Sequence, residues 1–281
     1  MRWGGDGGGN IEDRRGMGAV GVGGLGAGGV ILALVGYFFF GIDPSTTTSV
    51  LQGAAPTQQQ DGVRGAPSDQ AGRFVDVVSG NVDDVWTALF RQEGERYERP
   101  AAIVLYDQAT GTGCGTGQAA MGPFYCPTDR KVYLDLSFWQ ELEQKFGAGG
   151  EAARAYVIAH EIGHHVQTLT GASAKARRLG AKGAESGSVR LELQADCYAG
   201  VWVAHAAQVS NGQVALDPRD IEDGLRAAAA VGDDTLQRKA QGQVVPDAFT
   251  HGSSEQRMRW FRKGAETGDP NSCDTFGTDR L

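Results

Sequence analysis

The chain has 281 residues, a formal net charge of −8 and a sequence isoelectric point of 5.2. This acidic balance argues against a general nucleic-acid-binding protein, which would carry a basic surface. The length suffices for a sizeable core in one domain or two. Glycine is abundant, at 43 residues, but fifteen of these lie in the first 41 residues, and the remainder has an ordinary globular composition.

Residues 1–42 divide into a short tail and a candidate membrane anchor. Residues 1–16 are rich in glycine and charge and show no pattern that would pack, so we expect a cytoplasmic tail. Residues 17–42 contain no charged residue, and as a helix they would reach about 39 Å, enough to cross a hydrocarbon core of about 30 Å. Arg14 and Arg15 favour a single-pass membrane protein with a cytoplasmic N-terminus and the bulk of the chain outside. A cleaved signal peptide is the alternative.

The glycines of this segment match two further patterns. Gly24 and Gly28 would line one face of a helix, which is a weak indication of a homodimer formed through the anchor. Gly21-x-Gly23-x-x-Gly26 matches the dinucleotide-binding fingerprint. No strand precedes it and no β-α-β unit surrounds it, so we predict no nucleotide site there.

The chain changes from a linker to a folded domain near residue 73. Residues 43–72 are rich in Thr, Gln, Gly, Ala and Pro, which predicts a flexible linker. Order is expected from Phe74, and a helix running to Phe90 would be capped by Asn81 or Asp83.

Three segments predict a small sheet. Residues 101–106 and 131–136 are short apolar runs typical of strands, and residues 111–126 are glycine-rich and hairpin-like. Further along the chain, Asp217 begins a helix that ends near Gly232. Residues 253 and 256, Ser and Gln, form a capping-box pattern for a last helix, which the glycine at 264 would close.

Residues 157–166 carry the motif on which the functional interpretation depends. His160 and His164 lie one helical turn apart and project from the same side, a spacing at which two imidazoles bind one Zn²⁺. Glu161 would lie beside water on that metal and act as a general base. An apolar stripe on the opposite side of the helix predicts that the two imidazoles face an interior site, and His165 at its edge is expected to pack in the core.

A third zinc ligand would separate enzyme classes. In the pattern H-E-x-x-H-x-x-G-x-x-H the third ligand is the last histidine. Here Gln167 and Thr170 stand in place of the glycine and that histidine, so the chain does not match this pattern. The other option is a glutamate on a following helix, where Glu192 and Asp196 lie one turn apart in an apolar run. Glu192 is the predicted ligand, and Asp196 is predicted to hold a ligating histidine, because a buried carboxylate needs a partner. A half-exposed helix whose acids face solvent is the alternative.

The spacing His160-Glu161-x-x-His164 followed by Glu192-x-x-x-Asp196 resembles the gluzincin arrangement of thermolysin-like peptidases. The wider sequence, roughly residues 73–281, is similar to a bacterial family described as "putative neutral zinc metallopeptidases" with an N-terminal membrane anchor. The similar runs are GPFYCP at 122–127, VYLD at 132–135, ADCYAG at 195–200 and HGSS at 251–254. The resemblance implies peptidase activity and a zincin-like α+β fold, mainly helical with a small sheet. It also implies that residues 131–134 edge the substrate cleft, where an extended peptide would pair with the backbone.

Four cysteines fit an oxidising compartment, and they allow three pairings. We favour Cys114 with Cys126, which closes the hairpin-like loop, and Cys197 with Cys273, which ties the tail to the helix of the third ligand. Structural zinc held by cysteines is the alternative, but no C-x-x-C spacing supports it.

Hydrolysis of an amide also needs a donor for the oxyanion besides the metal. The candidates are His251, His205, Tyr125 and Tyr133, and the resemblance favours His251. The alternative for His251 is a loop histidine bonded to backbone, and His205 is expected on the surface.

The sequence therefore predicts a membrane-anchored, extracytoplasmic zinc endopeptidase that acts on peptides or proteins. One Zn²⁺ would be held by His160, His164 and Glu192, with Glu161 as the base. A second possibility is a non-enzymatic membrane protein whose structural zinc serves assembly or regulation, and a third is a hydrolase of non-peptide amides. Structural sites have four protein ligands and catalytic sites leave a position for water, so three ligands favour catalysis.

Overall fold

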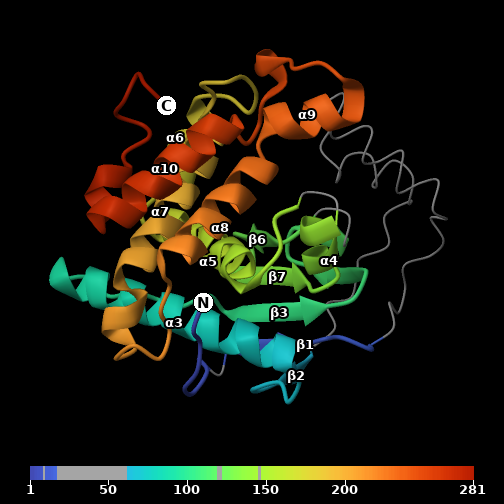
Figure 1. Ribbon diagram of the computed structural model, residues 1–281, viewed down its shortest axis with the longest axis vertical. Helices are drawn as coiled ribbons and strands as arrows, with labels where there is room; N and C mark the ends of the chain where they lie inside the picture. The colour runs from blue at the N-terminus through green and yellow to red at the C-terminus, as the bar shows by residue number, and fades with distance from the viewer. Residues whose placement is uncertain (9, 18–61, 119–121, 145–146) are drawn as a thin grey trace.

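The computed structural model describes residues 1–8, 10–17, 62–118, 122–144 and 147–281, which form a small sheet packed against a larger group of helices (Figure 1). The strands are β1 (Ile11–Asp13), β2 (Val63–Arg64), β3 (Ala102–Tyr106), β4 (Ala109–Thr112), β5 (Gly115–Gln118), β6 (Phe124–Cys126) and β7 (Lys131–Asp135). The helices are α3 (Gln70–Gln92), α4 (Phe138–Gln144), α5 (Glu151–Leu169), α6 (Ala172–Arg178), α7 (Gly187–Val209), α8 (Pro218–Ala230), α9 (Asp233–Gln241), α10 (Ser254–Thr267) and the short 3₁₀ segments η2 (Pro246–Ala248) and η3 (Pro270–Cys273). The predicted α+β class, mainly helical with a small sheet, is confirmed.

Five strands pair in the order β2-β1-β3-β7-β6. The three inner strands run parallel, and β2 and β6 are antiparallel to their neighbours. Every residue of β3 and β7 is buried. Ile103 and Leu105 pack with residues of α3 and α5, whereas Val104 and Tyr133 belong to a smaller apolar cluster on the other face. The strands predicted at 101–106 and 131–136 are confirmed, and their continuous apolar runs are typical of strands covered on both faces.

The strand that borders the motif helix is β6. β7 lies between β3 and β6, so the expectation that residues 131–134 edge the cleft is wrong. The turn at residues 127–130 brings β6 back antiparallel onto β7 and covers its free side. Asp129 stabilises this turn by accepting hydrogen bonds from the backbone N–H groups of Gly113 and Lys131. β6 contacts α5 directly.

Residues 1–16 belong to the same folded body, contrary to the expectation of a tail that does not pack. Ile11–Asp13 pairs in parallel with β3, which makes β1 an inner strand of the sheet. Glu12 is fully buried and accepts hydrogen bonds from Lys131 Nζ and Arg14 Nε, each at 2.8 Å. A buried charge is tolerated when it is paired in this way. Two of the charges that made this segment look solvent-exposed, Glu12 and Arg14, therefore neutralise one another inside the protein.

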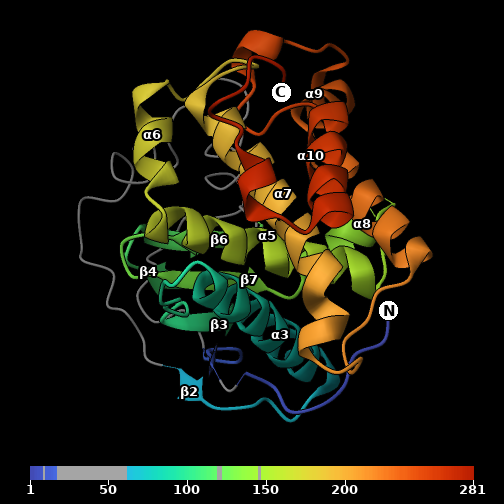
Figure 2. The ribbon, with the colours of Figure 1, turned by 90° about the vertical axis from the view of Figure 1, so that its left-hand side faces the viewer.

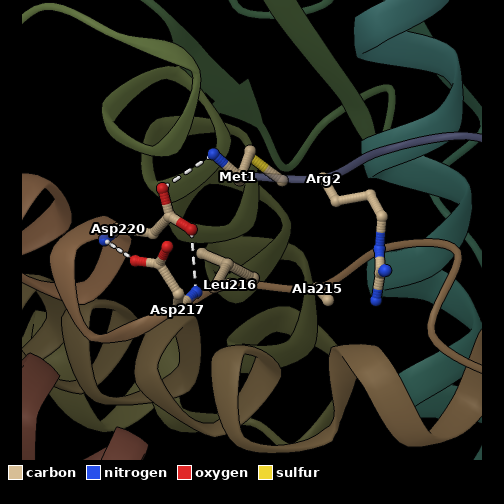
Figure 3. A pocket seen from close by; sticks show the side chains of 6 residues that line it. All are labelled: Met1, Arg2, Ala215, Leu216, Asp217 and Asp220. Carbon is tan, nitrogen blue, oxygen red and sulfur yellow. Dashed lines mark hydrogen bonds and ion pairs between the residues drawn. The ribbon is translucent and has the colours of Figure 1, made fainter.

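The first residues of the chain contact two helices as well. The Met1 nitrogen donates a hydrogen bond to Asp220 Oδ1 at 2.7 Å, and Asp220 forms the capping box of α8 with Asp217 (Figure 3). The Trp3 indole N–H donates to Glu151 Oε1, in the first turn of α5, at 2.8 Å. The N-terminal segment is thus held to both the sheet and the helices.

The predicted membrane anchor at residues 17–42, with its glycine face, lies outside the described residues except for Met17. Most of the predicted linker at residues 43–72 also lies outside them. Among the residues that the structure describes, no helix combines the length and apolar character needed to cross a bilayer. The described end of the linker region differs from the prediction, because residues 63–64 form β2 and α3 begins at Gln70.

The termini of α8 and α10 follow their local capping signals. Asp217 caps the start of α8 and a capping box begins α10 at Ser253, as predicted, and α8 also proves to have a capping box, with Asp220. The expected end of α10 at Gly264 is wrong, since the helix continues to Gly268, which adopts a left-handed φ of 62°. Gly264 serves a packing role instead.

Helix α3 begins earlier than predicted, because Asp69 is its N-cap. The two expected caps lie buried within the helix. Asn81 Oδ1 accepts a hydrogen bond from the Trp202 indole, and Asp83 Oδ1 accepts one from the Tyr97 hydroxyl, both at 2.8 Å. These partners are distant in sequence, so a local pattern could not distinguish a capping role from a buried one.

The sheet has a consequence for membrane topology. A single crossing between residues 16 and 62 would separate β1 from β3, so the segment 1–16 and the rest of the described chain are expected on the same side of a membrane. We predict that Asp6→Cys and Glu255→Cys, at two exposed positions, react equally with a membrane-impermeant maleimide in intact spheroplasts that produce the full chain. The four native cysteines are paired in disulfides and give no background.

The control is the same labelling after lysis, which should modify both variants. Labelling of one position and protection of the other in intact spheroplasts would contradict the prediction, because β1 could not then pair with β3.

Candidate metal centre

Helix α5 presents its two motif histidines toward the interior. Ile158 and Ile162, on the opposite side of the helix, are fully buried in the core. His160 is 6% exposed, and the His164 ring lies 4.7 Å from the His160 ring between centroids. The 3.6-residue period of the helix thus places both imidazoles in one interior site.

Helix α7 brings Glu192 against both imidazoles. Glu192 Oε2 lies 3.1 Å from His160 Nε2, and Oε1 lies 3.4 Å from His164 Nε2. Their ligand atoms all lie within 4.8 Å of one another, and the described residues contain no second such group of three His, Cys, Asp or Glu. The helices approach closely because residue 163 is glycine: a Cβ there would lie 3.3 Å from Ala195 Cα.

These three groups fit a zinc ion. Zinc–ligand bonds of 2.0–2.2 Å in a tetrahedron place neighbouring ligand atoms about 3.3–3.6 Å apart. The two distances between the Glu192 oxygens and the imidazole Nε2 atoms agree with that spacing. Two imidazoles and one carboxylate leave the fourth position of the tetrahedron to water or substrate, which is the arrangement of catalytic zinc sites.

Asp196 orients the His160 ring by accepting a hydrogen bond from Nδ1, the ring nitrogen that faces away from Glu192. It is fully buried, and its Oδ1 accepts hydrogen bonds from His160 Nδ1 at 2.9 Å and from the Tyr156 hydroxyl at 2.5 Å. With Nδ1 donating, Nε2 is the nitrogen that remains for a metal. Burial lowers the pKa of His160, but the hydrogen bonds to Asp196 and Glu192 outweigh it and raise that pKa to about 10. A metal ion that bound here would therefore displace a proton.

A different group orients His164. Its Nδ1 donates a hydrogen bond to Gln167 Oε1 at 2.8 Å. Gln167 Nε2 donates in turn to the backbone oxygen of Leu191 at 2.7 Å and to Gln194 Oε1 at 3.2 Å, both on α7. Gln167, one of the two residues that depart from the H-E-x-x-H-x-x-G-x-x-H pattern, thus fixes the second imidazole and links it to the neighbouring helix. This role of Gln167 was not visible in the sequence.

Glu161 follows His160 and lies in the same interior site. It is 7% exposed. Burial raises the pKa of its carboxyl above the usual value, although the nearby histidines oppose the shift. A carboxylate with a raised pKa is a better general base at neutral pH than a solvated one.

His251 lies on the loop before α10, near the third ligand. Burial raises the pKa of Glu192, but the neighbouring imidazoles, His251 included, lower it well below its usual range. Asp233 organises this loop, since its Oδ2 accepts three successive backbone N–H groups at residues 250–252. Its Oδ1 also lies 3.4 Å from His251 Nδ1. His251 Nδ1 also lies 2.8 Å from the Thr250 hydroxyl, so Nε2 is the nitrogen that remains for a substrate. Burial lowers the pKa of His251, but Asp233 and Glu192 outweigh it and raise that pKa, which favours the imidazolium form in which Nε2 can donate.

The other oxyanion candidates are engaged elsewhere. His205 Nε2 is bonded to a backbone carbonyl at the end of α10, at 2.8 Å. The Tyr133 hydroxyl donates to Asp129 at 2.6 Å, and the Tyr125 hydroxyl donates to His165 Nδ1 at 3.1 Å. His165 is fully buried, as its place at the edge of the core stripe predicts.

Both favoured disulfide pairings are present. Cys114–Cys126 joins the β4–β5 hairpin to β6, and Cys197–Cys273 joins η3 to α7. Cys197 directly follows Asp196, so the second disulfide constrains the helix that carries Glu192 and Asp196.

Comparison with known proteins places the chain in a family. It matches the family described as "Putative neutral zinc metallopeptidase" over residues 1–276 and belongs to that family. It is 45% identical to "Uncharacterized protein YpfJ" of Escherichia coli (strain K12) over 284 residues, which cover 95% of this chain and 96% of the relative. It is 49% identical to "Uncharacterized protein Rv2575" of Mycobacterium tuberculosis (strain ATCC 25618 / H37Rv) over 222 residues, or 75% and 74% of the two chains. No solved structure matches the chain.

The family match begins at residue 1 and therefore includes the segment that forms β1. The resemblance noted in the sequence covered only residues 73–281. The wider match agrees with the packing of the N-terminal segment into the sheet.

Replacing Glu192 tests the ligand set. We predict that Glu192→Ala lowers zinc affinity by more than the 10–100-fold typical of changes to the outer partners of a ligand, because a direct donor is lost. The matched control is Glu185→Ala, an exposed glutamate just before α7. Zinc per chain is measured by mass spectrometry after dialysis, with affinity from chelator competition. Equal affinity in the Glu192→Ala and wild-type proteins would exclude this carboxylate as a ligand.

Proposed function

We propose that the protein is a zinc-dependent peptidase that acts outside the cytoplasm. The observation that carries the proposal is the convergence of His160 Nε2, His164 Nε2 and Glu192 on one point, with both Nδ1 atoms engaged behind them. Membership in a family named for neutral zinc metallopeptidases supports the same activity.

The side chains divide the chemistry among them. A zinc ion in such a site lowers the pKa of water and polarises a carbonyl group. Glu161 takes the proton from the attacking water and passes it to the departing amine. His251, oriented by Asp233, donates a hydrogen bond to the oxygen on which negative charge develops.

The substrate is proposed to be an extended peptide that pairs with β6. This strand is the end of the five-stranded sheet next to α5. A backbone edge at that place gives main-chain hydrogen bonds to a peptide and aligns it past the histidines. The disulfide at Cys126 fixes the strand.

The proposed location follows from the disulfides. Two bridges within the domain fit an oxidising compartment outside the cytoplasm. Attachment to the bacterial plasma membrane through residues 17–42 remains part of the proposal and rests on the sequence of that segment. The pairing of β1 with β3 requires residues 1–16 on the same side as the domain, so the proposed attachment is not the single crossing with a cytoplasmic N-terminus expected from the sequence.

A non-enzymatic protein with a structural zinc is the second candidate. A structural site would need a fourth protein ligand, and the group of converging ligands in the described chain contains three. Hydrolysis of a non-peptide amide would use the same side chains, so it differs from the proposal in substrate alone.

The general base can be removed without removing a metal ligand. We predict that Glu161→Gln keeps one zinc per chain but cleaves peptides about 10²–10⁴-fold more slowly, the usual contribution of a positioned base. A mixed peptide library is incubated with each purified protein, and products are identified by mass spectrometry. The control, Glu255→Gln on the exposed side of α10, should cleave like the wild type. Undiminished cleavage by Glu161→Gln protein would refute the mechanism.

A further inference from the structure

Helix α10 places an arginine at the back of the metal site. Arg257 is 3% exposed, whereas Arg262 on the same helix is exposed. Residues 257–263 are the basic run RMRWFRK, a composition typical of a helix with one solvated face. Arg257 instead shares the helical phase of the buried Trp260 and Phe261, three and four residues later.

The guanidinium group of Arg257 binds Asp196 through two parallel hydrogen bonds. Nε donates to Asp196 Oδ2 at 2.8 Å, and Nη2 donates to Oδ1 at 2.9 Å. Nη2 also lies 3.2 Å from the Tyr156 hydroxyl, 3.5 Å from His160 Nδ1 and 4.0 Å from Glu192 Oε2. One cation therefore reaches both carboxylates of α7 and the imidazole beside them.

The contact between α7 and α10 fixes where this cation lies. The two helices run alongside each other (Figure 2). A Cβ on Gly264 would lie 1.9 Å from the Cys197 carbonyl oxygen, and a Cβ on Gly200 would lie 2.1 Å from a carbonyl oxygen of α10. The two backbones are therefore in contact, and the packing of the two helices fixes the distance between Arg257 and Asp196.

The paired hydrogen bonds restrict the carboxylate more than a single charge would. A planar guanidinium that donates two parallel bonds fixes the plane of the carboxylate, which a lysine ammonium does not. Oδ1 of Asp196 also accepts from His160 and Tyr156. A rotation of this carboxylate would break all of these contacts together.

We propose that Arg257 is a positioning residue of the metal site. It fixes the carboxylate of Asp196, and through it the His160 ring, in the orientation in which Nε2 binds zinc. This inference rests on the proposed zinc centre, and it assigns the site a third helix beyond α5 and α7.

Metal binding by the purified full chain tests the role without reference to cleavage. We expect Arg257→Met to lower zinc affinity about tenfold or more, as loss of an outer partner does, and to alter the visible spectrum of Co²⁺-substituted protein. Arg257→Lys, which keeps the charge but not the paired bonds, should fall between Arg257→Met and the wild type. Arg262→Met is the matched control and should match the wild type in both measurements.

A double variant separates action through Asp196 from an independent effect. Asp196→Asn alone should weaken zinc binding, and adding Arg257→Met should weaken it little further, because both changes disturb one interaction. Circular dichroism of each variant verifies the fold.

Three results would overturn the proposal. The first is wild-type zinc affinity and an unchanged Co²⁺ spectrum in folded Arg257→Met protein, and the second is an additive loss in the double variant. Should Arg257→Met fail to fold, wild-type affinity and spectrum in Arg257→Lys would overturn it equally. A wild-type chain that binds no zinc would refute the metal centre itself, and this outcome is distinguishable from a failure of Arg257 alone.

Discussion

The close crossing of α5 and α7 is the constraint on which the candidate site depends. The absence of a side chain at Gly163 lets the α7 backbone approach at Ala195. At that separation one turn of α7 reaches both nitrogens of His160, with Glu192 on the Nε2 side and Asp196 on the Nδ1 side. A wider crossing would lengthen both contacts at once, so the ligand and its support depend on the same packing.

Charge balance is the second constraint on this interior. Glu161, Glu192 and Asp196 are carboxylates in or beside one buried site, and burial works against the charged form of each. Arg257 and the two imidazoles oppose that cost. The same principle operates in the sheet, where a buried glutamate of β1 is neutralised by Lys131 of β7 and Arg14. In both places buried ion pairs specify which segments meet.

The sequence predicted well those features that a helical period or a helix cap determines locally. The spacing of His160 and His164, the neighbouring acids of α7 and the N-caps of α8 and α10 needed no knowledge of the tertiary fold. The two buried strands were visible as apolar runs, and of the three possible cysteine pairings the favoured one is present.

The sequence did not predict contacts between charged or polar residues that lie far apart in the chain. Arg257 meets a partner 61 residues away, and a charged residue is assumed to face solvent when its partner is unknown. β1 pairs with a strand about ninety positions further on, so its two charged residues concealed a buried strand. One available signal was missed: Arg257 falls on the apolar stripe of α10 with Trp260 and Phe261.

The measurement that tests the account most directly is X-ray absorption at the zinc edge of the purified, zinc-loaded chain, with and without a small thiol at stoichiometric concentration. The account predicts nitrogen and oxygen neighbours near 2.0–2.2 Å, with no sulfur, and a new sulfur neighbour near 2.3 Å once the thiol occupies the open position. A four-ligand shell that the thiol leaves unchanged, or sulfur present from the start, would contradict it.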